Sequence, residues 1–301
     1  MSLRALPYVS LTALLFGSTL IASRFSVGQY EPLTYLTLRV LIASAGYLLI
    51  LLFHPQRNFP KDLTLWRHAT ILGVFGTAVN LVCIVSSLQY LSAGLVAILI
   101  TTSPVVTAFI AGLVLPEEKL NRNQWVGVAL ALSGAILLAI AGENGLPDVS
   151  PDVRGYLLVA VPVISGSIAT VYARQTLKDY DPVDVTSIRI FVATLVILPL
   201  TIAFAGFDTS AVDIGGVGAV LYAALVGTFG GFFVQVYVIT QFGAVPSSMV
   251  TYLIPLVAGV GGVFILRERI TPLMMVGMVI IVIGILLVQR GRLPVIKPKQ
   301  A

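Results

Sequence analysis

The sequence predicts an all-α integral membrane protein with ten transmembrane helices, arranged as two inverted repeats of five helices each. Three observations predict this fold class: the composition, the number of long apolar segments, and a pattern of residues that occurs twice. Of the 301 residues, 57% are hydrophobic and only 10% are charged, whereas a soluble domain carries about 25% charged residues. So few charges could not cover a water-exposed surface, so we expect a lipid bilayer around the protein.

Ten stretches of the chain are long and apolar enough to cross a membrane, which takes about 20 mostly apolar residues. The first stretch is too long for the apolar core of a signal peptide, and we interpret it as the first helix. No connection between stretches is long enough to form a separate soluble domain. The expected helices span residues 7–27, 32–53, 67–89, 93–115, 122–141, 154–174, 184–205, 215–239, 245–266 and 272–290.

The distribution of lysine and arginine predicts the orientation of these helices. If the N-terminus is cytoplasmic, 12 basic residues fall in cytoplasmic segments and 4 in outer segments. Cytoplasmic loops of membrane proteins carry such an excess of basic residues. We therefore expect a multi-pass protein of the cytoplasmic (inner) membrane with both termini in the cytoplasm. The two remaining basic residues, Arg39 and Arg189, lie inside expected helices.

A pattern in the first half of the chain returns about 150 residues later. Arg24, Tyr30-Glu31-Pro32 and Arg39 match Arg174, Tyr180-Asp181-Pro182 and Arg189, each at a separation of 150. We therefore divide the chain into a first repeat, residues 1–146, and a second repeat, residues 147–301. Further pairs follow in the same order at a separation of 150 or 151: Gly76-Thr77 with Gly227-Thr228, Ala93 with Ala244, Pro104 with Pro255, Glu118 with Glu268, Gly127 with Gly277, and Gly134 with Gly284.

Each repeat holds five expected helices, and this odd number makes the second repeat enter the membrane from the opposite side. Inverted repeats are typical of secondary transporters, which bind their substrate near the middle of the membrane. We therefore expect a carrier of small molecules that works by alternating access. A channel is the alternative, although it would need a continuous polar ring. An enzyme would need a nucleophile and a base at membrane depth, and we expect no enzymatic activity.

Several motifs also resemble the drug/metabolite transporter (DMT) superfamily, in particular the EamA family. The resemblance covers about residues 7–290 and implies a ten-helix fold that exports amino acids or other small metabolites. Phe16-Gly17-Ser18 is similar to the Trp-Gly-Ser element of the family's first helix, with phenylalanine in place of tryptophan. A proline-containing helix, a glutamate-containing turn and a glycine-bearing helix occur twice: Ser103-Pro104, Glu117-Glu118-Lys119, Gly127 and Gly134, then Ile254-Pro255, Arg267-Glu268-Arg269, Gly277 and Gly284.

Arginine inside a membrane span is costly and usually has a function or a partner. Arg39 and Glu268 are both expected near the outer side, and the repeat places Arg189 and Glu118 at the equivalent inner positions. Our hypothesis is that Arg39–Glu268 and Arg189–Glu118 form two ion pairs between the halves, which break alternately as gates. In the alternative interpretation, each arginine reaches to lipid headgroups or holds a local helix end.

Polar residues at membrane depth are the candidate substrate contacts. Asn80 and Gln235 are the strongest, because an amide in hydrocarbon costs free energy unless it is hydrogen-bonded. Serine and threonine more often bond to a backbone carbonyl or allow close packing, and tyrosine could stack on the cargo or simply pack. The predicted contacts are Ser18, Thr77, Asn80, Thr228, Gln235, Tyr237 and Tyr252, and the other polar residues at membrane depth are Ser103, Ser167 and Thr251.

Pro104 and Pro255 lie inside expected helices and should kink them, because proline removes a backbone hydrogen bond. No histidine or carboxylate lies at membrane depth, so we expect facilitated diffusion or exchange of a zwitterionic, neutral or weakly anionic cargo. We expect no metal, no cofactor and no nucleic-acid partner. The expected partners are a small-molecule substrate and the lipid bilayer, and a monomer is compatible with the sequence.

Overall fold

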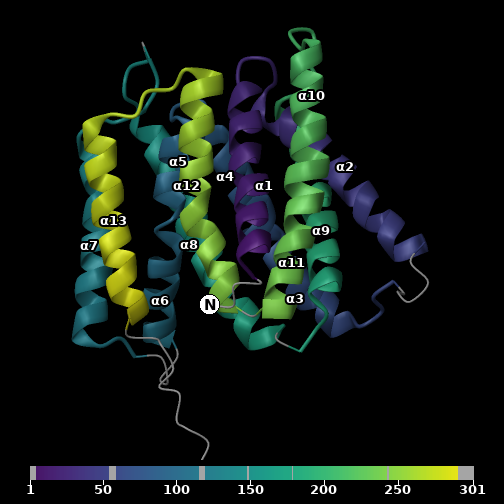
Figure 1. Ribbon diagram of the computed structural model, residues 1–301. Coiled ribbons are helices and arrows are strands. Elements are labelled where there is room, and N and C mark those ends of the chain that lie inside the picture. The colour runs from purple at the N-terminus through teal and green to yellow at the C-terminus, as the bar shows by residue number, and fades with distance from the viewer. Residues whose placement is uncertain are drawn as a thin grey trace, which may run out of the picture.

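The computed structural model describes residues 5–53, 59–114, 119–147, 149–177, 179–242 and 244–290. Within these ranges the regular elements are helices, and ten membrane-length spans stand side by side in one bundle (Figure 1). This confirms the predicted fold class. The first span begins and the last span ends at the same end of the bundle (Figure 1). We call this the inner end and the opposite one the outer end.

The spans of the first half begin and end within a few residues of the predicted limits. The first, second and fifth spans are single helices, α1 (Leu6–Phe25), α2 (Pro32–Phe53) and α7 (Arg122–Ile140). The third and fourth spans are interrupted. The third consists of α3 (Leu63–Gly73), η2 (Val74–Ala78) and α4 (Val79–Ser87), and the fourth of α5 (Ala93–Ile100) and α6 (Ser103–Val114).

The second half repeats this order of spans. Aspartate starts the third span in the first half and the matching eighth span in the second, where Asp62 and Asp213 accept backbone N–H bonds as N-caps. The five spans are α8 (Val153–Thr176), α9 (Pro182–Phe204), α10 with η4 and α11 (Ile214–Tyr222, Ala223–Gly230 and Gly231–Phe242), α12 (Ala244–Leu266) and α13 (Pro272–Arg290).

The third and eighth spans change from α-helix to π-helix at matched positions. The π-helical segments η2 and η4 contain the repeated Gly-Thr pairs, Gly76-Thr77 and Gly227-Thr228. In each segment the threonine hydroxyl donates to the carbonyl five residues earlier, at 3.3 Å from Thr77 and 3.0 Å from Thr228. π-helical turns are rare and occur often at functional sites, so these matched segments mark a candidate site.

The two matched prolines differ in their surroundings. The fourth span is interrupted at Thr101 and Thr102, whose hydroxyls donate to carbonyls three residues earlier. Pro104 is the second residue of the helix that follows, α6. Pro255 lies inside α12, and that helix continues through it. The two halves are therefore alike in topology but not identical in conformation.

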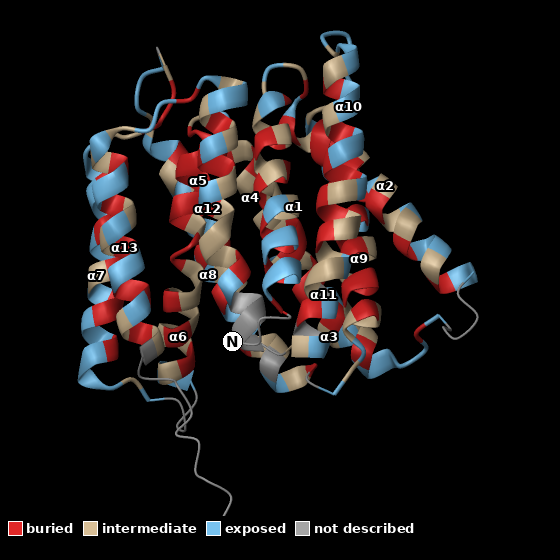
Figure 2. Cartoon of the chain, in the orientation of Figure 1, coloured by how far each residue is buried: buried red, intermediate tan, exposed pale blue. Residues whose placement is uncertain are grey.

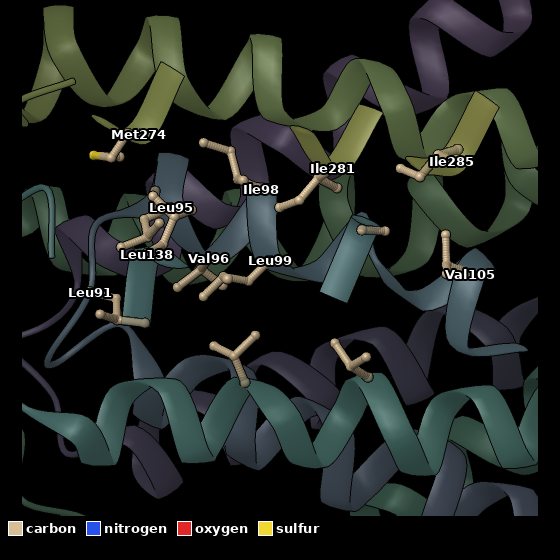
Figure 3. Close-up of a cluster of buried hydrophobic side chains, with 14 of the residues drawn as sticks. Leu91, Leu95, Val96, Ile98, Leu99, Val105, Leu138, Met274, Ile281 and Ile285 are labelled. Carbon is tan, nitrogen blue, oxygen red and sulfur yellow. The ribbon is translucent and has the colours of Figure 1, made fainter. Parts of the chain in front are cut away.

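The largest cluster of buried apolar side chains surrounds α5 (Figure 3). Leu95, Val96 and Leu99 of α5 pack against side chains of α7, α8 and α13, and each is at most 5% exposed. By contrast, large apolar side chains such as Leu63, Phe264 and Ile214 are more than 80% exposed. Exposed residues lie along the outward faces of the helices (Figure 2). Such a surface is stable in lipid, which needs no polar coat.

The fifth and tenth spans meet backbone to backbone through glycines. A Cβ atom at Gly127 would lie 2.6 Å from the carbonyl oxygen of Gly284, and one at Gly134 would lie 3.0 Å from that of Gly277. Gly127 matches Gly277 and Gly134 matches Gly284 in the repeat, so the two contacts exchange when the halves are exchanged. The bundle thus has a pseudo-two-fold axis in the membrane plane, as inverted repeats require.

Candidate functional site

The candidate site lies where α2 and α9, the matched second and seventh spans, pack against each other. The hydroxyls of Ser44 and Thr194 hydrogen-bond at 2.7 Å. Because these residues are 150 positions apart, they occupy the same place in the two repeats, and the pseudo-two-fold axis passes close to this bond. Arg39 and Arg189 each precede this contact by five residues on helices that run in opposite directions. They therefore lie on opposite sides of the axis.

Arg39 is enclosed by hydroxyl groups from both halves. Its Nε donates to Thr228 Oγ1 at 2.6 Å, and its Nη1 donates to Ser23 Oγ at 3.3 Å. Ser23 in turn bonds to the hydroxyl of Tyr35 at 3.1 Å. The side chain does not reach the surface, since Arg39 is only 7% exposed. The interpretation that Arg39 extends to lipid headgroups is therefore wrong for this structure.

Arg189 makes the matched bond on the other side of the axis. Its Nε donates to Thr77 Oγ1 at 3.1 Å, and its Nη2 donates to the carbonyl of Gly76 at 3.4 Å. In both sites an arginine of one repeat thus binds the threonine in the π-helical segment of the other repeat. Arg189 differs from Arg39 in being only half-buried. The two sites share the arginine–threonine bond but differ in how far the arginine is buried.

Asn80 belongs to the Arg189 site. Its Nδ2 donates to the Gly76 carbonyl at 3.1 Å, the same oxygen that accepts from Arg189. Its Oδ1 accepts from the hydroxyl of Ser165 in α8 at 2.6 Å. Thr77, Asn80, Ser165 and Arg189 therefore form one polar cluster at membrane depth, which we call the inner polar cluster. The sequence indicated three of these residues but gave no signal for Ser165.

The remaining predicted contacts lie in other surroundings. The hydroxyl of Ser18 bonds to that of Tyr222 at 2.8 Å. Tyr237 is 40% exposed and its ring packs 5.1 Å from that of Tyr8. Tyr252 hydrogen-bonds to Gln289 of α13. Gln235 is half-buried on α11.

Glu268 does not form the expected ion pair with Arg39 in this structure. Arg267 has a left-handed backbone conformation, with φ 56°, and Glu268 N–H then donates to the Gly262 carbonyl at 3.0 Å. This turn brings Glu268 Oε1 to 3.8 Å from Arg24 Nε and directs the carboxylate at the start of α5. Arg39 instead donates a hydrogen bond to Thr228. Glu118, expected to pair with Arg189, lies outside the described residues.

The outer end of the bundle is closed by contacts among three loops. Ser92 N–H donates to the Asn144 carbonyl at 2.8 Å, and Arg269 N–H donates to the Gly145 carbonyl at 2.9 Å. Below them, α5 and α12 touch where Gly94 meets Gly259. A pocket of about 230 Å³ remains at this end, and its lining includes Arg24, Phe25, Leu146, Leu266 and Glu268. These contacts cover the outer end above α5 and the α12–α13 loop, and Arg189, on the other side of the pseudo-two-fold axis, is half-buried.

Comparison with known proteins places the chain among transporters. Residues 3–140 and residues 153–290 each match the same family model, described as the EamA-like transporter family. The two matches fall on either side of the expected division at residue 146. Each repeat of the chain therefore corresponds to one copy of that family's domain.

Relatives of similar length carry transporter names. The chain is 24% identical over 288 residues to an "Uncharacterized transporter" of Archaeoglobus fulgidus, covering 94% of this chain and 98% of the relative. It is 27% identical over 283 residues to the "Uncharacterized inner membrane transporter YedA" of Escherichia coli, covering 93% and 88%. A solved structure described as "Crystal structure of protein" has a TM-score of 0.66 at 19% identity, covering 94% of this chain and 96% of that one. At that identity the likeness supports the fold alone.

Proposed function

Because this chain belongs to the EamA-like transporter family, we propose that it is a secondary transporter that moves small metabolites across the cytoplasmic (inner) membrane by alternating access. The observation that carries this proposal is the pair of matched bonds between the halves, Arg39–Thr228 and Arg189–Thr77. Two equivalent sites on opposite sides of one axis are what a carrier needs to present the same chemistry to each side of the membrane in turn.

The unequal access of the two arginines supports alternating access. Arg39 is 7% exposed and lies towards the covered outer end, whereas Arg189 is half-buried and lies towards the inner end. In an inverted repeat, each half can take the conformation of the other, which would exchange these two environments. The second conformation would bury Arg189 and expose Arg39, with the outer end open.

The polar groups of the site favour a small polar cargo. Around the two arginines the described partners are hydroxyls, an amide and carbonyls. Such a site suits amino acids and related zwitterionic or neutral metabolites. The resemblance to metabolite exporters favours transport out of the cell. With the N-terminus in the cytoplasm, the half-buried Arg189 lies on the side of the axis from which an exporter takes its cargo.

A counterflow assay tests this proposal. Purified full-length protein is placed in liposomes loaded with a pool of unlabelled amino acids, and uptake of a labelled pool is followed. We expect saturable uptake that transiently exceeds equilibrium, because a carrier exchanges one bound cargo for another. Flux that rises linearly with concentration and shows no counterflow would identify a channel and overturn alternating access. Liposomes without protein give the background.

A further inference from the structure

We propose that the inner polar cluster is a docking site for a carboxylate, with Arg189 as its cation, so that the cargo of this protein is a carboxylic acid. Arg39 with Thr228 is the equivalent carboxylate site on the outer side of the axis, and we call these two sites the stations. This inference rests on the proposed transport function and narrows its substrate class. It excludes sugars, nucleosides and other neutral compounds as the principal cargo.

The charge balance of the site supports a negative ligand. A cation at membrane depth is costly unless it is paired. Among the described residues, ion pairs join Arg24 to Glu268 and Arg154 to Asp152, and neither Arg39 nor Arg189 has a described carboxylate partner. The groups bound to Arg189 are a hydroxyl and a carbonyl, which carry no net charge. An incoming carboxylate would supply a negative charge that none of these described partners supplies.

The hydrogen-bond geometry leaves donors for such a ligand. A guanidinium has five N–H donors, and Thr77 and Gly76 accept two of those on Arg189. These two bonds fix the plane of the guanidinium and leave three donors without a partner among the described residues. The Asn80 amide has two N–H groups, and Gly76 accepts one of them. Because Arg189 and Asn80 both donate to one oxygen atom, their remaining donors lie close enough to bind one carboxylate together.

The positions of the two arginines favour two successive stations over one shared site. Each arginine lies five residues from the Ser44–Thr194 contact, on opposite sides of it. At a rise of 1.5 Å per residue, the two Cα atoms are separated by about 15 Å along the bundle. Each side chain also points towards the start of its own helix, away from the axis. One carboxylate cannot contact both arginines and would pass from one to the other.

The cluster also predicts which part of an amino acid is recognised. It has donors for the acid group but no described carboxylate for the ammonium group. We therefore expect acids to bind whether or not they carry a free amine. Amino-acid amides, which keep the amine but lack the carboxylate, should not bind.

Thermal-shift titration of the purified full-length protein tests this inference. The probes are a pool of amino acids, a pool of N-acetyl amino acids, the matched amino-acid amides, uridine, glucose and sodium chloride. We expect the two pools of acids to stabilise the wild type and the other probes to have no effect. Stabilisation by the amides, or equal stabilisation by chloride, would overturn the proposal. So would a failure of every acid to bind.

Variants of the cluster separate binding from folding. Arg189→Gln should weaken acid binding by about tenfold or more, because a charge-assisted hydrogen bond is lost. Arg189→Lys should keep part of the affinity. Arg154→Gln is the matched control, since it removes an arginine that pairs with Asp152 near the surface, and it should bind as the wild type does. Unchanged acid binding by Arg189→Gln would contradict the proposal.

Asn80→Asp gives a second test that does not depend on losing the arginine. It places a tethered carboxylate beside Arg189, where we expect it to occupy the site and abolish acid binding without lowering the melting temperature. Acid binding at wild-type strength in this variant would also overturn the inference. The counterflow assay distinguishes the two proposals. If uridine or glucose exchanges and no acid does, the proposal of transport is supported and the proposal of a carboxylate site is overturned. If no probe exchanges, the result contradicts both proposals.

Discussion

Glu268 and Arg24, from different repeats, lie 3.8 Å apart at the outer end of the bundle. The same carboxylate accepts backbone N–H bonds from Ala93 at 2.9 Å and Gly94 at 3.5 Å, which caps α5. A helix N-terminus favours negative charge, so one acid satisfies two positive partners. Glu268 is only 6% exposed. This single side chain therefore joins α1, α5 and the α12–α13 loop at the outer end.

Replacing Glu268 should alter the pH dependence of stability. Burial raises the pKa of the Glu268 carboxyl above its ordinary value of 4.5, although the N–H groups of Ala93 and Gly94 and the charge of Arg24 act in the opposite direction. The folded protein then binds this proton more tightly than the unfolded chain. The protonated Glu268 carboxyl therefore adds to the free energy of unfolding. This stabilisation is complete at pH values below the ordinary pKa and is lost as pH rises through the folded-state pKa.

Thermal unfolding in detergent at a series of pH values from about 4 to 8 measures this effect. Glu268→Gln cannot titrate, so the decline attributable to this group should be absent from its profile. Glu31→Gln, which removes an exposed carboxylate, serves as the control and should keep the wild-type profile. Parallel profiles for the wild type and Glu268→Gln would show that Glu268 does not titrate differently on folding.

Removing the Thr228 hydroxyl should destabilise the protein more than removing that of Thr77. Thr228→Val leaves the Nε of the buried Arg39 without its acceptor at 2.6 Å. An unsatisfied buried donor costs about 1–3 kcal/mol. Arg189 is only half-buried and its bond to Thr77 is longer, at 3.1 Å, so we expect Thr77→Val to cost less. Melting temperatures of both variants test the order, and Thr228→Ser, which restores a hydroxyl, should recover most of the loss. An equal drop in melting temperature in both variants would contradict the difference in burial between Arg39 and Arg189.

Alanine should not be tolerated at the glycine contact between α7 and α13. In Gly284→Ala the new methyl group would lie 2.5 Å from the backbone nitrogen of Ala131, so the helices must separate. Overpacking of this kind costs about 1–3 kcal/mol. Gly218→Ala is a matched control in α10, where a Cβ meets nothing within 4 Å. It should be neutral or slightly stabilising, because alanine favours helix over glycine. Similar melting temperatures for the two variants would contradict the close contact.

The orientation of the bundle can be measured by cysteine labelling. Cys83 is the single cysteine, so Cys83→Ala gives a background for new thiols. Thr209→Cys lies in an exposed loop at the outer end, and Lys61→Cys is exposed in a loop at the inner end. If both termini are cytoplasmic, a membrane-impermeant maleimide added to intact cells should label position 209 and not position 61. The reverse pattern would invert the predicted topology.

The spans and their inversion could be predicted from the sequence because they depend on composition and on spacing. Apolar length decides where a span can begin and end, and Pro32 and Pro272 start their helices at the predicted residues. The repeat also identified Arg39, Arg189, Thr77 and Thr228 as matched residues. It could not indicate that each arginine binds the threonine of the other repeat, because a separation along the chain says nothing about distance between helices.

Backbone geometry explains the other features of the site that could not be predicted from the sequence. The π-helical segments η2 and η4 have no compositional signal, yet they place Thr77 and Thr228 in reach of the arginines. Charge alone could not decide between Arg24 and Arg39 as the partner of Glu268. The left-handed conformation of Arg267 decided it by turning the chain back over Gly262.

The crossing of the two Arg–Thr bonds has a consequence for how such a chain could have arisen. Each repeat contains both parts of the site, yet neither Arg39 nor Arg189 uses the threonine of its own repeat. Two copies of a half-length ancestor, inserted in opposite orientations, would place the arginine of each against the threonine of the other. Two half-length chains packed in opposite orientations would therefore already form both Arg–Thr bonds, and joining them into one chain would preserve both.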